Sequence, residues 1–353
     1  MTRFPEIEPA ALTQIVARYT GLGPLRGIVR NGLSANTATC VFETDTGRYF
    51  AKRYDPRVTD PHALLGEHSI VLQLRAAGYP TPRLHANNRG DTLTWLAESP
   101  YAVFSLARGE DRYGDEPVFA PYRDREDARA AGAMLARYHL TLREGPLPRP
   151  RPFKGLVAQF QAVASADFPA ALEGLVAAAP PLATYTATRP EWQDLVRGLH
   201  APADRLQALA RDWPAGIIHG DWIKRNLFWQ GHEVVDVLDF GLWNVGPWVY
   251  DLALALLPVG FDWPRVLADE APPNHRDMVA FLAGYQGVRP LEPDEREGLA
   301  TLVETARVEF YLSAVLQALE REDQGQAAMF WDLLVATRRW FEAHPGWSDA
   351  LAR

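Results

Sequence analysis

Cysteine and long apolar runs are both scarce in this sequence, and each scarcity excludes a class of protein. The 353 residues include one cysteine, Cys40, so no disulfide can form within the chain. No stretch approaches the roughly 18 uninterrupted apolar residues of a membrane-spanning helix. The opening sequence MTRFPEIEPA also lacks the apolar core of a signal peptide. We therefore expect a cytoplasmic protein with no membrane partner.

Lysine is the third scarce residue. Of the 36 basic residues only three are lysines, Lys52, Lys154 and Lys224. Arginine cannot replace lysine where a compact point charge is needed, so each of these positions is a candidate for function. The net charge is -8, which argues against a nucleic-acid partner, because such proteins normally carry a basic face. The sequence carries no signal for an oligomeric state.

The order of predicted elements indicates an α+β protein with two parts. Strand-like runs occur at GIVRN, TATCVFET, RYFAKRY, DTLTWLA and YAVFSLA. Only one helix, over 61–77, interrupts them, and the short connections favour a mostly antiparallel sheet. Further along, helical periodicity dominates at 124–142, 155–178, 189–212, 276–287, 291–321 and 325–342, while AAAPP near 177–181 predicts a loop. We place the boundary near 106–112, giving a sheet domain at 1–106 and a helical domain at 107–353.

The segment 217–253 carries the clearest chemical pattern. Asp221 follows His-Gly, Asn226 lies five residues later, and Asp239 ends an apolar strand and precedes Phe-Gly. Phosphoryl transfer needs a carboxylate that orients and deprotonates the attacking hydroxyl, and Asp221 fits this role. It also needs oxygen ligands for Mg²⁺, which Asn226 and Asp239 can supply. Protein kinases arrange the same three groups in the same order. We interpret His219 as a packed histidine that shapes the loop, and Asp251 as a helix N-cap or a carboxylate that braces the loop.

Lys52 and Glu67 are the predicted phosphate-binding pair. Lys52 lies in the strand RYFAKRY, and Glu67 is the only acidic residue of the helix 61–77. A kinase uses such an ammonium to hold the nucleotide phosphates and a helix carboxylate to fix it.

Two backbone segments complete the predicted nucleotide site. The turn after the first strand contains Ser34, Asn36 and Thr37, whose hydroxyl, amide and backbone groups can hold phosphates. The end of the last strand, including Ser105 and Ala107, lies at the domain boundary, where backbone groups can hydrogen-bond a purine base.

Residues beside the catalytic pattern are candidates for binding the acceptor. Lys224 and Arg225 can contact the γ-phosphate or the acceptor, or can be solvated loop charges. Trp222, Trp243 and Trp248 can stack on a sugar, ring or cation, or can belong to the core.

These motifs resemble those of the aminoglycoside phosphotransferase and choline kinase superfamily. The motif H-G-D-x4-N stands at His219–Asn226, the D-F-G-like motif at Asp239–Gly241 and Y-D-L-A at Tyr250–Ala253. The resemblance implies a bilobal protein-kinase-like fold, with a small antiparallel N-lobe that binds ATP or GTP with Mg²⁺ and a larger helical C-lobe.

Within the superfamily, three segments are similar to type II homoserine kinases. They are GRYFAKRY, LRAAGYPTPRL and the stretch 281–313. The region near 155–205 and the tryptophans depart from that group, and they favour a larger natural product, such as an antibiotic, over homoserine as the hydroxyl acceptor.

Two other interpretations stay open at the level of sequence. A nucleotide-binding pseudokinase would lack one of the three catalytic groups, and all three are present. A metal-dependent hydrolase would use His219, Asp221, His232 and Asp239, but their spacing matches no standard metal site. Such an enzyme would also leave Lys52 and Glu67 without a role.

Overall fold

The computed structural model describes residues 5–33, 37–56, 59–151, 162, 165, 167–349 and 351. The chain forms two compact units. The first comprises Met1–Glu110 with Phe228–Gln230 and Val235–Gly241, and the second comprises Asp111–Leu227, Gly231–Val234 and Leu242–Arg353. Two short segments near the D-F-G-like motif therefore belong to the sheet-containing unit, although the sequence places them within the helical part.

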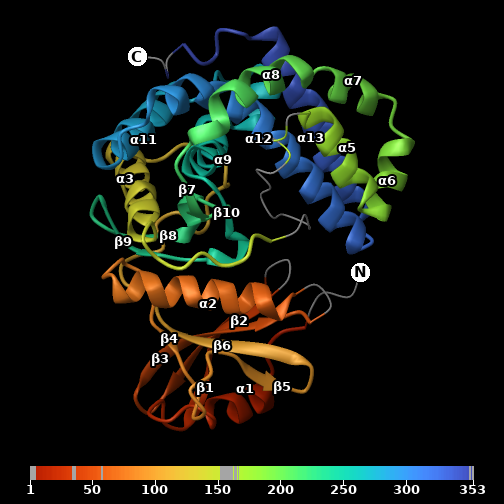
Figure 1. Ribbon diagram of the computed structural model, residues 1–353. Helices are drawn as coiled ribbons and strands as arrows, with labels where there is room; N and C mark the ends of the chain where they lie inside the picture. The colour runs from red at the N-terminus through yellow and green to blue at the C-terminus, as the bar shows by residue number, and fades with distance from the viewer. Residues whose placement is uncertain are drawn as a thin grey trace. The chain divides into compact units, whose positions relative to one another are not determined.

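The first unit is built on a six-stranded sheet in which every pairing is antiparallel. The strands are β1 (Leu25–Leu33), β2 (Thr37–Thr44), β3 (Gly47–Tyr54), β4 (Leu84–His85), β5 (Thr94–Leu96) and β6 (Ser99–Ser105). Their order is β1-β2-β3-β6-β4, with β5 also paired to β6. Two helices, α1 (Pro9–Val16) and α2 (Pro61–Ala76), lie beside the sheet (Figure 1).

Alternation along β2 explains how the sheet acquires its core. Successive side chains of a strand point to opposite faces, and here Ala38, Cys40 and Phe42 are all buried. They pack with Leu12 and Ile15 of α1 in a single apolar cluster. The core of this unit therefore lies between the central strands and α1.

The second unit is mainly helical. Its helices are α3 (Arg125–Thr141), α5 (Phe168–Ala177), α6 (Pro180–Ala187), α7 (Glu191–Arg197), α8 (His200–Leu209), α9 (Trp248–Gly260), α10 (Trp263–Leu267), α11 (His275–Val288), α12 (Pro293–Glu320) and α13 (Gln324–Ala343). Single 3₁₀ turns lie at η1 (Ala210–Asp212), η2 (Lys224–Asn226) and η3 (Phe240–Leu242). The short strands β7 (Ala215–Ile218) and β10 (Asn244–Pro247) pair with each other. So do β8 (Leu227–Gln230) and β9 (Glu233–Val237), which belong in part to the first unit.

Two local predictions were only partly correct, and two short strands were not predicted. The helical window 189–212 is broken into α7 and α8, with Gly198 as the C-cap of α7. The loop predicted at AAAPP is confined to Ala178 and Ala179, because α5 continues to Ala177 and α6 begins at Pro180. Proline is favoured in the first turn of a helix, since its missing N–H has no helical partner there. The strands β4 and β10 were not predicted, and both are short.

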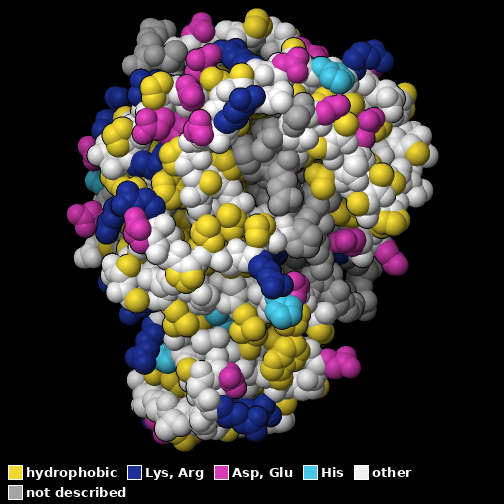
Figure 2. Space-filling view, viewed as in Figure 1, with side chains coloured by type: hydrophobic (Ala, Val, Ile, Leu, Met, Phe, Trp, Pro, Cys, Tyr) yellow, Lys and Arg dark blue, Asp and Glu magenta, His cyan; other side chains and the backbone are white. Residues whose placement is uncertain are grey.

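The fold is of the α+β class, with an antiparallel sheet unit and a mostly helical unit. No helix in the described ranges is both long enough and apolar enough to cross a membrane. On the face that Figure 2 shows, basic and acidic side chains of the described residues are interspersed rather than gathered into one basic surface.

Candidate functional site

The loop that carries Asp221 begins where β7 ends. Gly220 adopts a φ of +75°, and a Cβ at this position would lie 2.3 Å from the carbonyl oxygen of Leu242. Both the left-handed backbone and the close approach require glycine. The glycine of the His-Gly-Asp motif is therefore fixed by the geometry of the loop, which turns the chain so that Asp221 follows at its tip.

Asp251 of α9 stabilises the loop that carries Asp221. Its carboxylate accepts hydrogen bonds from the backbone N–H groups of His219 (2.7 Å) and Gly220 (3.0 Å), and from Nε2 of His139 (3.0 Å). Burial raises the pKa of Asp251, but the hydrogen bonds from the His139 side chain and the His219 backbone outweigh burial and hold that pKa below its usual value. The interpretation of Asp251 as a loop-bracing carboxylate is confirmed.

His219 is fully buried and acts on the shape of the loop. Its Nδ1 accepts a hydrogen bond from the backbone N–H of Asp221 at 3.3 Å. Its ring makes edge contacts with the rings of Tyr138 and Trp222, at centroid distances of 5.7 and 5.1 Å. This arrangement confirms the prediction of a packed histidine that shapes the loop.

Asp221 and Asn226 are brought together in the second unit. Nδ2 of Asn226 donates to the backbone oxygen of Asp221 at 2.9 Å and to its Oδ2 at 3.2 Å. Because both partners are oxygens, the NH₂ group must face Asp221, and the amide oxygen of Asn226 faces elsewhere. That oxygen is a hard ligand of the kind that Mg²⁺ prefers, so the residue present fits a metal-binding role.

The first unit brings Lys52, Glu67 and Asp239 together. Lys52 Nζ lies 2.9 Å from Oδ1 of Asp239 and 3.7 Å from Oε1 of Glu67. Burial alone would lower the pKa of Lys52, but the two carboxylates outweigh it and raise that pKa well above its usual value. Lys52 therefore remains an ammonium, the form that binds phosphate. The Asp239 side chain is half exposed, which leaves its carboxylate accessible to a cation.

Asp239 has an unusual backbone conformation, with a φ of +57°. Non-glycine residues in this region carry strain, which clusters at functional sites. The preceding strand is held firmly, since Val237 donates to the carbonyl of Pro80 at 3.0 Å and Asp236 accepts from the backbone and side chain of Arg108 at 2.7 Å. The bonds between Asp236 and Arg108 were not predicted, although an acidic residue inside an apolar strand is a visible signal in the sequence.

The predicted nucleotide-binding backbone is described only in part. Ser34 and Asn36 lie outside the described residues, whereas Thr37 is a buried residue of β2. Ser105 ends β6, and both its N–H and its Oγ bond to the backbone of Arg83, at 2.8 and 2.9 Å. Ala107 follows two residues later and is partly buried. Their role toward a base stays a prediction.

The residues expected to meet the acceptor are occupied by contacts within the protein. Trp222, Trp243 and Trp248 are 3%, 2% and 4% exposed, so in this structure their rings belong to the core. Lys224 is also buried, and its Nζ is bound to Glu116, so it is not a solvated loop charge. Arg225 is exposed, and its Nε donates to the backbone oxygen of Glu116 at 2.7 Å. The expectation that these tryptophans present open stacking faces is therefore not supported by their burial.

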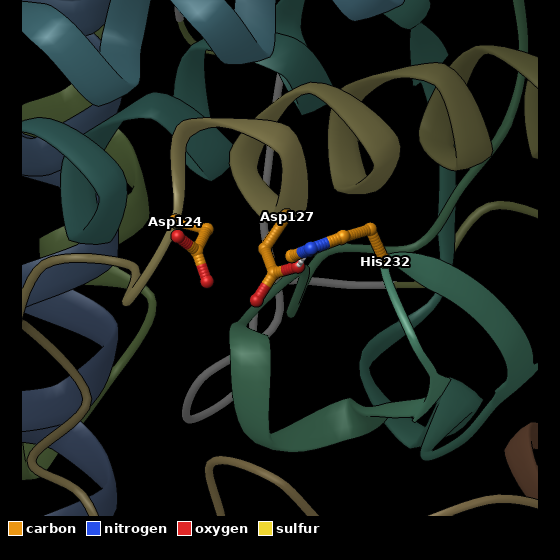
Figure 3. Close-up of side chains that lie close together, drawn as sticks. All are labelled: Asp124, Asp127 and His232. Carbon is orange, nitrogen blue, oxygen red and sulfur yellow. Dashed lines mark hydrogen bonds and ion pairs between the residues drawn. The ribbon is translucent and has the colours of Figure 1, made fainter.

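One group of side chains among the described residues has metal-like spacing, but its chemistry does not fit a metal site (Figure 3). It consists of Asp124, Asp127 and His232. His232 Nδ1 is bonded to Asp127 at 2.8 Å, and Arg112 and Tyr113 bind the same carboxylate. The buried charge is thus already compensated. His232 belongs to this ion-pair cluster, which removes one ligand from the hydrolase interpretation.

The chain matches a known protein family. Residues 28–291 match the phosphotransferase enzyme family. The chain belongs to this family. Two relatives are homoserine kinases, from Methylorubrum populi (27% identical over 325 residues) and Methylobacterium radiotolerans (29% over 327 residues). Each alignment covers 90% of this chain and 89% of the relative.

Solved structures show the same fold. An amicoumacin kinase in complex with AMP-PNP, Ca²⁺ and Ami is 14% identical, with a TM-score of 0.62 and coverage of 94% of both chains. A microcompartment-associated aminopropanol kinase is 18% identical, with a TM-score of 0.58 and coverage of 98% of this chain and 99% of that one. The protein is a small-molecule kinase with a hydroxyl acceptor, and the resemblance to aminoglycoside phosphotransferases and homoserine kinases is confirmed.

Proposed function

We propose that this kinase transfers the γ-phosphate of ATP, with Mg²⁺, to the hydroxyl of a small hydroxy amino acid or amino alcohol, with homoserine as the first candidate. The observation that carries the proposal is the Asp221–Asn226 pair. It presents a carboxylate, partly exposed, and an amide whose oxygen faces away from that carboxylate. These are the groups that phosphoryl transfer to a hydroxyl requires.

Each residue has a distinct role in the proposed reaction. Asp221 orients the acceptor hydroxyl and takes its proton as the oxygen attacks the γ-phosphorus, while the bond from that phosphorus to the β,γ-bridging oxygen breaks and ADP leaves. Lys52, fixed by Glu67, binds the phosphates. Asn226 and Asp239 would each offer an oxygen ligand to Mg²⁺, which when bound neutralises charge on the phosphate oxygens. Calorimetric titration with Mg·ADP tests the metal role, since Asp239→Ala should weaken binding strongly only when Mg²⁺ is present.

The preference for a small acceptor has two supports. The homoserine kinase relatives align along nearly the whole of both chains. The indole rings of Trp222, Trp243 and Trp248 are buried, which removes the reason to favour an acceptor with a large ring. A natural-product antibiotic is the alternative acceptor, and it was the one that the tryptophan pattern favoured.

A substrate panel tests the proposal. The measurement is kcat/KM for homoserine and short amino alcohols beside aminoglycoside and nucleoside antibiotics, with ATP and GTP each as donor. Asp221→Asn is the blank for contaminating kinases. A value of about 10⁴ M⁻¹s⁻¹ or more for homoserine or an amino alcohol supports the proposal. Comparable turnover of an antibiotic, with none of the small acceptors, would overturn it.

A further inference from the structure

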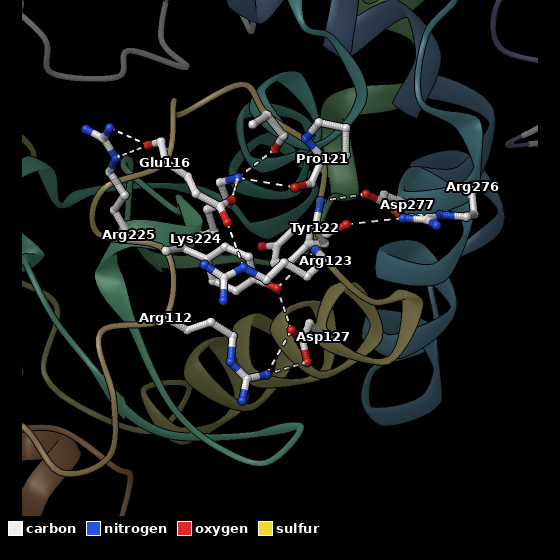
Figure 4. A network of polar contacts seen from close by, with 12 residues as sticks. Arg112, Glu116, Pro121, Tyr122, Arg123, Asp127, Lys224, Arg225, Arg276 and Asp277 are labelled. Carbon is white, nitrogen blue, oxygen red and sulfur yellow. Dashed lines mark hydrogen bonds and ion pairs between the residues drawn. The ribbon is translucent and has the colours of Figure 1, made fainter.

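Lys224 lies inside the loop 219–226, which we call the catalytic loop. It comes three residues after Asp221 and two before Asn226. Figure 4 shows its side chain turned toward the segment 113–123. Its Nζ lies 2.8 Å from Oε2 of Glu116, 2.8 Å from the carbonyl of Ala120 and 3.3 Å from the carbonyl of Pro121. An ammonium has three N–H donors, so these partners use its full capacity. In this arrangement Lys224 does not bind a phosphate or an acceptor.

Burial makes the Lys224–Glu116 pair more than a surface contact. The Lys224 side chain is 3% exposed and that of Glu116 is 25% exposed. Burial lowers the pKa of Lys224, and Glu116 opposes that effect. For Glu116, burial raises the pKa, but Lys224 and Arg123 outweigh it and the pKa falls. The short contact pairs two opposite charges away from solvent, so removing one partner leaves the other without compensation.

The segment 113–123 is itself anchored to two helices. The backbone N–H of Tyr122 donates to Oδ2 of Asp277 on α11 at 2.8 Å, and the hydroxyl of Tyr113 donates to Asp127 on α3 (Figure 4). Lys224 thus links the loop that carries Asp221 to a segment that is itself bonded to α3 and α11.

The ion pair of Lys224 lies in the turn that also contains Asn226. Lys224 and Asn226 belong to the same single turn, η2. Asn226 at the end of this turn is bonded to Asp221. A shift of Lys224 would therefore move Asn226 relative to Asp221, and a displacement of about 1 Å in such a site can cost roughly 100-fold in rate.

We propose that Lys224 is a positioning residue: its ion pair with Glu116 fixes the turn Lys224–Asn226 and thereby the spacing of Asp221 and Asn226. The proposal rests on the roles given above to Asp221 and Asn226. It assigns a function in catalysis to Glu116, which lies outside the motif segment and has no contact with Asp221 among the interactions described.

A double-mutant cycle tests the proposal. Lys224→Met and Glu116→Gln should each lower kcat roughly 10- to 100-fold per folded molecule. The double variant should match the worse single variant within about 2-fold, because both changes break one interaction. Arg123→Gln is the matched control: Arg123 binds the other oxygen of Glu116 at 2.7 Å, is largely exposed and has no bond to residues 219–226 among the interactions described. It should stay within about 3-fold of the wild type, as expected for an exposed pair.

Calorimetry separates positioning from direct phosphate binding. If Lys224 contacts the γ-phosphate, Lys224→Met will lose affinity for Mg·AMP-PNP but not for Mg·ADP. Under our proposal the ratio of the two affinities stays at the wild-type value. Glu116→Gln keeps the test valid if Lys224→Met does not fold, because Glu116 is less buried.

Several results would overturn the inference. They are a selective loss of Mg·AMP-PNP affinity, a wild-type rate for Glu116→Gln, additive losses in the double variant, or rate losses that only follow the folded fraction measured by circular dichroism. Asp221→Asn distinguishes this failure from failure of the proposed function. If Asp221→Asn stays active, the assigned base is wrong; if it is inactive while both pair variants are normal, only the role of Lys224 fails.

Discussion

The carboxylate of Asp251 and the imidazole of His139 form a hydrogen bond of 3.0 Å in which neither side chain is exposed to solvent. Burial lowers the pKa of His139 and outweighs the opposing effect of Asp251, so the ring is neutral. Because the ionised carboxylate can only accept, the proton is on Nε2, and Nδ1 accepts from the hydroxyl of Tyr285 at 2.8 Å. The loop that carries Asp221 is therefore held by a carboxylate whose histidine partner, His139, is neutral and protonated on Nε2.

Replacing Asp251 with asparagine should affect both stability and rate. The carboxamide turns an NH₂ group toward donors that now bond to the carboxylate, so at least one buried N–H loses its acceptor. We expect a loss of about 2–4 kcal/mol in the free energy of unfolding, from urea titration, together with a lower kcat. Asp332→Asn, at an exposed position of α13, is the control. Unchanged stability of Asp251→Asn would contradict the bracing role.

His68 should make the protein less stable in mild acid. Burial, and secondarily the charge of Lys52, lower the pKa of His68 to about 4, against about 6.5 in the unfolded chain. Between these values the unfolded chain binds a proton that the folded protein does not, so stability falls as the pH drops from about 6.5 to 4. The difference corresponds to about 3 kcal/mol at pH 4.

The check is urea unfolding at pH 7 and pH 5 for the wild type and for His68→Asn. The variant should show a smaller loss between the two pH values. His62→Asn, exposed on the same helix, should keep the wild-type loss. Equal pH dependence in all three proteins would show that His68 does not titrate as argued.

Lys52 and Glu67 should be energetically coupled. Lys52→Met should lower kcat roughly 10²- to 10³-fold, the usual loss when one charge-stabilising donor is removed. Glu67→Gln should be milder, because Lys52 keeps its contact with Asp239 at 2.9 Å. Kinetics of both single variants and of the double variant measure the coupling, with Arg48→Met on the exposed side of β3 as the control. Strictly additive losses would mean that the two residues do not act as a pair.

The sequence predicted those elements that local pattern determines. Strand alternation located β2 and β3, and helical periodicity located α2 and α3 to within a few residues. Short strands such as β10 carry too few residues for a period, and they exist because a partner strand supplies the hydrogen bonds.

Contacts between residues of one loop could be predicted from the sequence. Contacts between distant segments of the chain could not. The spacing of Asp221 and Asn226 follows from one loop, so their contact could be anticipated. The burial of the tryptophans could not be anticipated, because burial depends on packing between distant segments. The sequence allows Trp222 to be a stacking surface, whereas in the structure its ring is enclosed by His219 and Tyr138. For the same reason the partner of Lys224, 108 residues earlier in the chain, had no signal in the sequence.

Asp221→Asn should abolish turnover while it leaves nucleotide binding intact. The proposed base acts on the acceptor hydroxyl and not on the nucleotide, so the loss should appear in kcat, by roughly 10²- to 10⁴-fold. The backbone oxygen of residue 221 still accepts one of the two hydrogen bonds from Asn226, which limits collateral change in the loop. Calorimetry with Mg·AMP-PNP should give the wild-type affinity within about 3-fold, and Asp212→Asn, at an exposed position before β7, should behave as the wild type in both assays. A rate above about a tenth of the wild type would exclude Asp221 as the base, since a positioned base contributes more than that. Loss of nucleotide affinity together with the rate would instead place Asp221 among the groups that hold the nucleotide.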